Sequence, residues 1–296
     1  MIIKRVGGKS KLADWICDNM PTGNIFVDVF GGSGAVLDCM MSRYKDVARH
    51  EMRFVFNDLD RKIYNLFKVM REMPMELAYQ IAATPYSRKE FNNAVSIIDS
   101  NQYQSLSDIE KARLFLIANR QSFGATMSKP WSITKDGEIN YRTWDQLPEM
   151  LVATALKWKS VYLECLDYKK LLDKWDDDKT IFYLDPPYEG IERAYYDVNK
   201  QNGFDHSEMF DILQNVKGSF AVSYYGGEND DSDTDIIKKY IESGCKVLRI
   251  QVKKHLAKSD KKTSATEVLL IKGDIRPFHG KCGYQIGDIF REKNVD

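Results

Sequence analysis

Short segments rich in β-branched and aromatic residues alternate along much of this chain with segments of helical periodicity. We expect strands at 25–30, 54–57, 160–165, 181–184, 220–224, 246–252 and 267–271. We expect helices at 35–44, 62–72, 168–175, 208–216 and 235–242. Such alternation predicts βαβ units, and therefore an α/β fold with a largely parallel sheet. The last two strands follow each other without a helix, which predicts an antiparallel hairpin at one edge.

The alternation stops between residues 73 and 158. Three helical patterns at 75–83, 87–98 and 106–120 are followed by a polar stretch, 121–142, of loop or hairpin character. We interpret this block as a subdomain inserted between the second and third strands. The predicted domains are a catalytic domain of residues 1–72 and 159–296 and an inserted subdomain of residues 73–158. Insertions on a cofactor-binding fold are where substrate choice is usually made.

The composition excludes several classes of protein. The five cysteines are widely spread and form no CxxC pair, which argues against a disulfide framework or a zinc knuckle and for a reducing compartment. The first residues lack the apolar core of a signal peptide, and no uncharged apolar run approaches the length of a membrane span. We therefore expect a cytoplasmic protein without a membrane partner.

The balanced charge hides local asymmetry. The chain has 43 basic and 43 acidic residues, but residues 1–13 carry four basic side chains and no acid. Basic residues also gather at 238–262, and acids at 173–178 and 228–235. This pattern fits a polyanion held on one side of the molecule, but charge alone favours two ordinary solvated faces.

A glycine-rich turn follows the first predicted strand. Gly31, Gly32 and Gly34 separate Phe30 from the next helical segment, so the backbone there can approach a ligand closely. This is the position of the first turn of a nucleotide-type cofactor site. The spacing is not GxGxxG and no GKS or GKT follows, which disfavours a phosphate-binding loop.

An acid stands at the end of the second predicted strand. Asp58 follows Asn57, and an acid there can accept hydrogen bonds from both hydroxyls of a ribose. The alternative is that it caps the helix that begins near Asp60. The sequence leaves both interpretations open.

The run Asp185-Pro186-Pro187-Tyr188 ends a hydrophobic strand. Two consecutive prolines cannot continue a sheet, and they fix the backbone. Asp185 and Tyr188 are therefore predicted to lie at the carboxyl edge of the sheet, where ligands of open α/β folds bind.

Taken in order, these motifs resemble the Dam-like DNA adenine-N6 methyltransferases of the α motif order. The similarity covers nearly the whole chain: Lys4-Arg5-Val6-Gly7-Gly8-Lys9, Phe30-Gly31-Gly32-Ser33-Gly34, Asn57-Asp58, Leu166-Asp167-Tyr168, Asp185-Pro186-Pro187-Tyr188, Ser223-Tyr224 and Thr266-Glu267-Val268-Leu269-Leu270, with Arg88 to Asn92 and Asn119-Arg120 in the insert.

The resemblance implies a Rossmann-like S-adenosyl-L-methionine-dependent methyltransferase sheet with an inserted helical target-recognition subdomain. It implies methyl transfer to the N6 amine of adenine in double-stranded DNA, with base flipping. Catalysis is assigned to Asp185, Pro186, Pro187 and Tyr188. Cofactor binding is assigned to Arg5, Gly8, Lys9, Asp28, Phe30, Gly31, Gly32, Ser33, Gly34, Asp58, Asp167, Tyr168 and Asp185. DNA binding is assigned to Arg88, Asn119, Arg120, Ser122, Lys129, Lys135 and Arg142, and no metal is expected.

Two departures from the family pattern stand out. Arg5 occupies the position of a tryptophan, so an apolar wall of the cofactor pocket has to come from elsewhere. The segment from Asn119 to Lys129 lacks the Asn-Gly and the downstream arginine expected of members that read GATC, and arginine is the side chain that reads guanine best. Lys129, Lys135 and Arg142 are either substitutes for that arginine, or phosphate contacts or solvated side chains.

Other functions are compatible with parts of the pattern. The same chemistry on cytosine-N4 or on adenine in RNA is a close alternative, and a non-catalytic DNA-binding protein of the same fold is a more distant one. A nicotinamide-dependent dehydrogenase is disfavoured by the missing GxGxxG. The sequence leaves the recognition site, a cognate restriction endonuclease and a bacterial or phage source open, and we expect a monomer or weak dimer.

Overall fold

The computed structural model describes residues 1–5, 7–44, 52–123, 130–132, 143–187, 204–226, 232–253 and 264–275. Its centre is a seven-stranded sheet in the order β3-β2-β1-β4-β5-β7-β6. The strands are β1 (Ile25–Asp28), β2 (Arg53–Asn57), β3 (Tyr162–Glu164), β4 (Thr180–Leu184), β5 (Ser219–Gly226), β6 (Lys246–Lys253) and β7 (Ser264–Lys272). The first five are parallel, and β7 is antiparallel to both of its neighbours.

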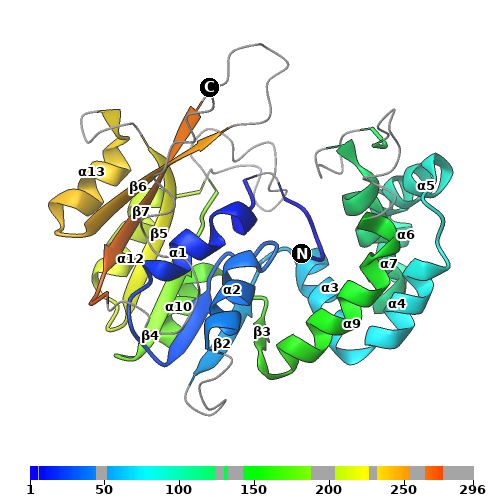
Figure 1. Ribbon diagram of the computed structural model, residues 1–296, viewed down its shortest axis with the longest axis horizontal. Coiled ribbons are helices and arrows are strands. Elements are labelled where there is room, and N and C mark those ends of the chain that lie inside the picture. The colour runs from blue at the N-terminus through cyan, green and yellow to red at the C-terminus, as the bar shows by residue number, and fades with distance from the viewer. Residues whose placement is uncertain are drawn as a thin grey trace, which may run out of the picture.

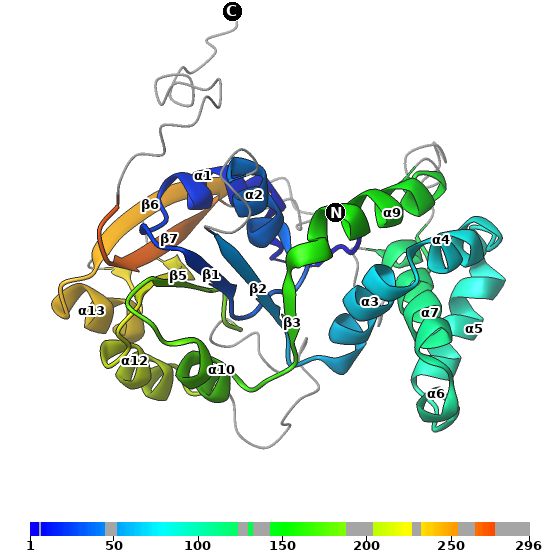
Figure 2. The same ribbon diagram turned by 90° about the horizontal axis from the view of Figure 1, so that it is seen from below.

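Helices cover both faces of the sheet. The helices α1 (Ala13–Asp18) and α2 (Ala35–Arg43) lie on one face, and α10 (Tyr168–Trp175), α12 (His206–Gln214) and α13 (Asp235–Glu242) lie on the other (Figure 2). Successive residues of a strand point to opposite faces, so Phe26 packs into the first core and Val27 into the second. Strands buried on both faces read as continuous apolar runs, which is why they are visible in the sequence.

A second group of helices lies beside the sheet, next to β3 (Figures 1 and 2). It contains α3 (Arg61–Glu72), α4 (Pro74–Ala82), α5 (Arg88–Ile98), α6 (Gln102–Ser105), α7 (Asp108–Gln121) and α9 (Leu147–Lys157). Local signals define the ends of these helices. Ser107 and Glu110 form a capping box at the start of α7, the Ser87 side chain caps α5, and prolines begin α4 and α9.

The predicted α/β fold with a Rossmann-like parallel sheet is confirmed, and so is the antiparallel pairing of the last two strands. The sequence did not show that β7 lies between β5 and β6. Helix α3, which the prediction assigned to the catalytic part, packs with the helical group. Within the stretch expected to form a loop or hairpin, Ser122 and Trp131 form an antiparallel bridge, and residues 124–129 and 133–142 lie outside the described part.

None of the helices among the described residues is long and apolar enough to cross a membrane. The same described residues contain no cluster of three or more histidine, cysteine or acidic side chains arranged to hold a metal ion.

Candidate active site

The glycine-rich turn joins β1 to α2 and is packed too tightly for side chains. A Cβ on Gly31 would lie 2.2 Å from the ring of Phe56, and one on Gly34 would lie 2.4 Å from the ring of Trp158. Gly34 also has a left-handed backbone, with φ of 70°. The glycines therefore allow the rings of Phe56 and Trp158 to pack against the side of the turn that faces the core. The opposite side of the turn is left for a ligand.

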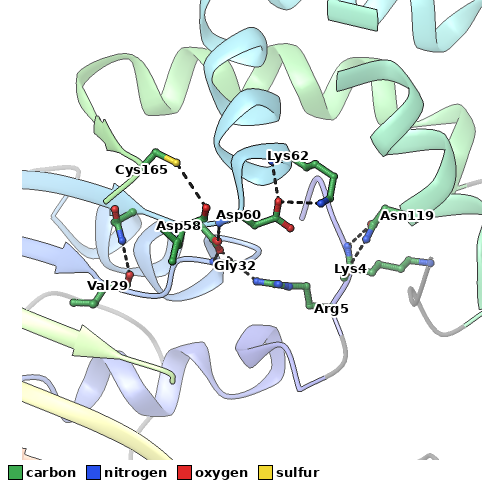
Figure 3. A network of polar contacts seen from close by, with 11 residues as sticks. Lys4, Arg5, Val29, Gly32, Asp58, Asp60, Lys62, Asn119 and Cys165 are labelled. Atoms are coloured by element: carbon green, nitrogen blue, oxygen red, sulfur yellow. Dashed lines mark hydrogen bonds and ion pairs between the residues drawn. The ribbon is translucent and has the colours of Figure 1, made fainter. Parts of the chain in front are cut away.

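Asp58, at the end of β2, organises the space above this turn. Its Oδ2 accepts the Gly32 N–H at 2.9 Å and lies 3.3 Å from the Arg5 guanidinium, and its Oδ1 accepts the Asp60 N–H at 2.9 Å (Figure 3). Burial raises the pKa of Asp58, and the charge of Arg5 opposes that shift. The cap of α3 is Asp60, which accepts from the Lys62 N–H. The capping alternative for Asp58 was therefore wrong.

Asn57 joins three strand ends at this edge. Its amide donates to the Val29 and Leu166 carbonyl oxygens at 2.9 and 3.1 Å, and its carbonyl oxygen accepts the Leu166 N–H at 2.8 Å. The side chain thus fixes the loops after β1 and β3 next to β2, and it holds Asp58 in place.

Asp185 follows β4, which lies beside β1 in the sheet. Pro186 is buried and Pro187 half-buried, so the backbone after the strand is held rigidly. The Asp185 Oδ1 atom accepts from the Lys9 ammonium at 2.8 Å, and the side chain keeps 22% of its surface exposed. The predicted catalytic carboxylate is therefore presented at the same edge as the glycine-rich turn.

Glu267 is a site residue that sequence reasoning missed. It lies on β7, only 1% exposed, and its Oε1 is 3.2 Å from the ammonium of Lys9. Burial by itself lowers the pKa of Lys9, but the charges of Asp185 and Glu267 outweigh it, so the pKa lies above its ordinary value. The signal for Glu267 in the sequence is an acid directly before the apolar run 268–271 of a strand, since a buried acid needs a cationic partner.

Asp28 ends β1. Its carboxyl accepts a hydrogen bond from the Leu37 N–H but forms no ion pair with a described residue. Burial raises its pKa strongly, and the charges of Asp185 and Asp58 add to the shift. Its Oδ1 atom is buried and makes no hydrogen bond within the described part of the chain. A buried acceptor without a donor is a position that a cationic ligand group can complete.

Aromatic side chains line the other side of the strand ends. The rings of Phe30, Tyr168 and Phe204 lie 5.4 to 6.0 Å apart, and Phe204 is 4.8 Å from the His206 ring. Asp167 caps α10 through the Lys169 N–H. Phe30 and Tyr168 belong to the predicted cofactor residues, whereas Phe204 and His206 were not expected there.

Three residues predicted to bind DNA contact the protein's own backbone. The Asn119 amide pairs with the Lys4 N–H and C=O groups, Arg120 donates to the Met1 and Thr143 carbonyl oxygens, and the Ser122 hydroxyl donates to the Asn119 carbonyl oxygen. All three are less than 9% exposed. A structural role accounts for these contacts, and the DNA contact stays a prediction.

Arg88 is placed differently. It is exposed at the start of α5, with its guanidinium 5.1 Å from the centre of the Trp131 ring. Lys129, Lys135, Arg142 and the catalytic-motif residue Tyr188 lie outside the described residues. The remaining predicted cofactor residues, Gly8 and Ser33, lie at the turn before Lys9 and in the glycine-rich turn.

The edge suits a nucleoside that carries a positive charge. Four carboxyls, those of Asp28, Asp58, Asp185 and Glu267, face two cations, Arg5 and Lys9. S-adenosylmethionine combines a ribose, a sulfonium and an ammonium group, and Asp28 has an unpaired acceptor for a cationic donor. The residues at the edge therefore fit this cofactor.

A Rossmann-like sheet with this edge defines a methyltransferase that uses S-adenosylmethionine as methyl donor. The family model of the D12 class N6 adenine-specific DNA methyltransferases matches residues 6–256. The chain belongs to this family, so it is an adenine-specific DNA methyltransferase and DNA is its substrate.

Known relatives agree with this membership. The chain is 23% identical over 228 residues to the DNA adenine methylase of Escherichia coli strain K12, covering 73% of this chain and 75% of the relative. The same values hold for the DNA adenine methylase of Escherichia coli O157:H7.

Among solved structures, a methyltransferase from Geobacter sulfurreducens aligns with a TM-score of 0.38 at 9% identity, over 93% of this chain and 82% of that one. An rRNA methylase from Streptococcus thermophilus aligns with a TM-score of 0.34 at 13% identity, over 92% and 99%.

Proposed function

We propose that the protein methylates adenine N6 within one short sequence of double-stranded DNA, and that the edge around Asp185 is its active site. The observation that carries this proposal is the position of Asp185. It stands on a rigid Pro-Pro turn at the carboxyl end of β4, beside the strand that leads into the glycine-rich turn.

The chemistry needs acceptors at fixed positions. The exocyclic amine of adenine is a poor nucleophile because its lone pair is delocalised into the ring. The Asp185 carboxylate and the Pro186 carbonyl oxygen each accept one amine hydrogen, which frees the lone pair for in-line attack. When bound, S-adenosylmethionine would supply the electrophilic methyl group, and S-adenosylhomocysteine would be the leaving group as the sulfur–methyl bond breaks. The methylated amine would give up one proton, which the Asp185 carboxylate can accept, and no metal is required.

The remaining edge residues hold the cofactor in this proposal. Asp58 accepts from the ribose hydroxyls in this proposal. Its Oδ2 already binds the Gly32 N–H and Arg5, whereas the Asp60 N–H occupies one of the two acceptor positions of Oδ1. Asp28 accepts from the ammonium group through its unpaired Oδ1. Lys9 sets the orientation of Asp185 through their ion pair.

Target recognition is assigned to the helical segment 73–158. The exposed Arg88 and the half-buried Trp131 form a cation–π pair there, and the Arg88 guanidinium suits a phosphate or a base. Lys129, Lys135 and Arg142 are the further candidates, and Tyr188 would stack on the flipped adenine. We propose that the protein is a monomer or weak dimer. A cognate restriction endonuclease is compatible with this function.

The first experiment is methyl transfer from labelled S-adenosylmethionine to unmethylated genomic DNA, read by base and flanking sequence. We expect N6-methyladenine in one short motif. Label on cytosine, on RNA alone, or on adenines without a common motif would contradict the proposal.

The matched variants are Asp185→Ala and Asp99→Ala. Asp99 is an exposed acid at the end of α5, so its removal changes the net charge equally without touching the edge. Asp185→Ala should lower the rate of transfer by about a hundred- to a thousandfold, the usual cost of losing one preorganised polar group. Its folding, and most of its DNA affinity, should resemble those of Asp99→Ala. A comparable rate in both variants would refute the assignment.

A further inference from the structure

The N-terminal segment, Met1–Arg5, connects the helical group to the edge of the sheet that carries Asp28, Asp58 and Asp185. This edge is called the cofactor edge below. Ile2 and Ile3 are buried at 2% and 1% exposure in the core shared with the helices. Arg120, at the end of α7, binds the Met1 carbonyl oxygen at 3.3 Å. The segment is therefore anchored in the shared core and tied to the end of α7.

The Asn119 side chain binds this segment at one residue, Lys4, by pairing with both its backbone N–H and its backbone C=O. Its Oδ1 accepts the Lys4 N–H at 2.9 Å, and its Nδ2 donates to the Lys4 C=O at 2.9 Å (Figure 3). The two residues are 115 positions apart in the chain, and Asn119 is 4% exposed. Only a side chain with one donor and one acceptor at this spacing can make both bonds, so Asn119 sets the position of the Lys4 backbone.

The chain just beyond this contact enters the cofactor edge. Arg5 follows Lys4, lies against Gly32 of the glycine-rich turn, and pairs with Asp58 at 3.3 Å (Figure 3). The Gly8 N–H then bonds to the Arg5 carbonyl oxygen at 3.1 Å, and Lys9 pairs with Asp185 at 2.8 Å. One short segment thus brings a cation to each end of the proposed site.

We propose that Asn119 is a positioning residue for cofactor binding, which acts through Lys4 on the contact of Arg5 with Asp58 and Gly32. This inference rests on the proposed function, because it takes Asp58 to be a cofactor ligand. It gives Asn119 a role at the cofactor edge rather than a contact with DNA. It also means that a displacement of the end of α7 changes cofactor affinity, and by linkage that cofactor binding acts back on this helix.

The test measures the affinity for S-adenosylhomocysteine by titration calorimetry with no DNA present. Asn119→Asp keeps the acceptor for the Lys4 N–H but loses the donor to its C=O, and it places a carboxylate against that carbonyl oxygen. We expect the affinity to fall by about tenfold, which corresponds to about 1.4 kcal/mol. Asn119→Ser, which is smaller and uncharged, should lower it in the same direction and serves if the first variant does not fold.

Gln121→Glu is the matched control. Gln121 is the next buried amide on α7, with 0% exposure, and it too pairs with backbone on both sides, accepting from Ser87 N–H and donating to Pro85 C=O. Its partners lie in the loop before α5 and not in the N-terminal segment. Gln121→Glu should therefore lose thermal stability to a similar degree while its affinity for S-adenosylhomocysteine stays near that of the parent.

Arg5→Ala tests the route. If Asn119 acts through Arg5, the double variant with Asn119→Asp should bind no more weakly than about the weaker single variant. If the loss of affinity in the double variant equals the product of the losses in the two single variants, Asn119 does not act through Arg5. Equal losses of affinity in the Asn119 and Gln121 variants, or no loss with Asn119→Asp, would overturn the proposal itself.

Asp58→Ala separates the two proposals. It should weaken binding by at least tenfold if Asp58 holds the ribose, about the value of one or two hydrogen bonds to a charged group. If Asp58→Ala matters and the Asn119 variants do not, only the present inference fails. If Asp58→Ala has no effect, the cofactor edge of the proposed function is wrong and the inference fails with it. Loss of DNA affinity in Asn119→Asp at unchanged cofactor affinity would instead support the DNA contact.

Discussion

Asp28 and Glu267 are both buried carboxyls at the same edge, but their surroundings differ. Glu267 lies 3.2 Å from the Lys9 ammonium, whereas the charges that act on Asp28 are those of Asp185 and Asp58. A buried charge without an oppositely charged partner lowers the stability of the fold. Where a buried ion pair exists, neutralising one member leaves the other charge uncompensated and lowers stability. The two residues should therefore respond to neutralisation in opposite ways.

Asp28→Asn should stabilise the cofactor-free protein at neutral pH by about 1–3 kcal/mol, because it removes an uncompensated buried charge. An unfolded aspartate titrates near pH 4, and the pKa of Asp28 is raised in the folded protein. The native carboxyl thus contributes its full stability below about pH 4 and loses it as the pH rises through the folded pKa. The gain from the Asp28→Asn substitution should be small at about pH 4 and grow towards pH 8.

Thermal unfolding of both proteins across this pH range provides the measurement. Glu267→Gln is the comparison, and it should destabilise the protein at neutral pH because Lys9 loses one of its two carboxylate partners, Asp185 and Glu267. A gain from Asp28→Asn that is constant with pH would contradict the argument. Under the proposed function the same variant binds S-adenosylhomocysteine more weakly, so here stability and binding change in opposite directions.

At the scale of elements, the glycine-rich turn is the part most constrained by packing. Gly34→Ala should cost about 1–2 kcal/mol for the left-handed backbone and about 1–3 kcal/mol more for the clash with Trp158. Combining it with Trp158→Leu removes the ring and should recover only the second contribution, relative to Trp158→Leu alone. Denaturant unfolding of the four proteins gives both values. Full recovery would show that the backbone conformation carries no cost.

The sequence predicted the elements well because their signals are local. The runs that form β1 and β4 are apolar and bounded by turn residues, and the range of α10 matches the expected 168–175. The motifs also placed Asp58 and Asp185 correctly, since the ends of parallel strands meet at one edge.

What the sequence left open depends on contacts between distant segments. The place of β7 between β5 and β6 follows from long-range strand pairing, for which no local pattern exists. The partner of Glu267 is Lys9, near the other end of the chain, and Asn119 pairs with Lys4 across 115 positions. Asn119 and Arg120 were assigned to DNA from the resemblance alone, and their burial was visible only in the folded chain.

At the scale of the molecule, the helical group and the sheet share one hydrophobic core. The core on the side of α1 and α2 continues from Phe26 and Phe56 through Phe67 and Trp158 to Leu116 and Leu151. Trp158 stacks on Phe67 of α3 at 4.7 Å between ring centres and also supports Gly34. The segment that joins the sheet to the helices is thus part of the packing of the glycine-rich turn.

A shared core predicts that sheet and helical group unfold together. Calorimetric heating should give one transition, and Leu116→Ala, at a fully buried site of α7, should lower its midpoint as a whole. The loss should be about 2–5 kcal/mol, the usual cost of removing a buried leucine side chain.

Saturating S-adenosylhomocysteine, which the proposal places at the carboxyl ends of β1, β2 and β4, should raise the midpoint of the same single transition by mass action in both proteins. Two transitions, with Leu116→Ala moving one and the ligand the other, would show that the helical group folds as an independent domain. In that case the contact between Asn119 and Lys4 would be a docking contact between two domains, and the loss of cofactor affinity in Asn119→Asp would measure how firmly they dock.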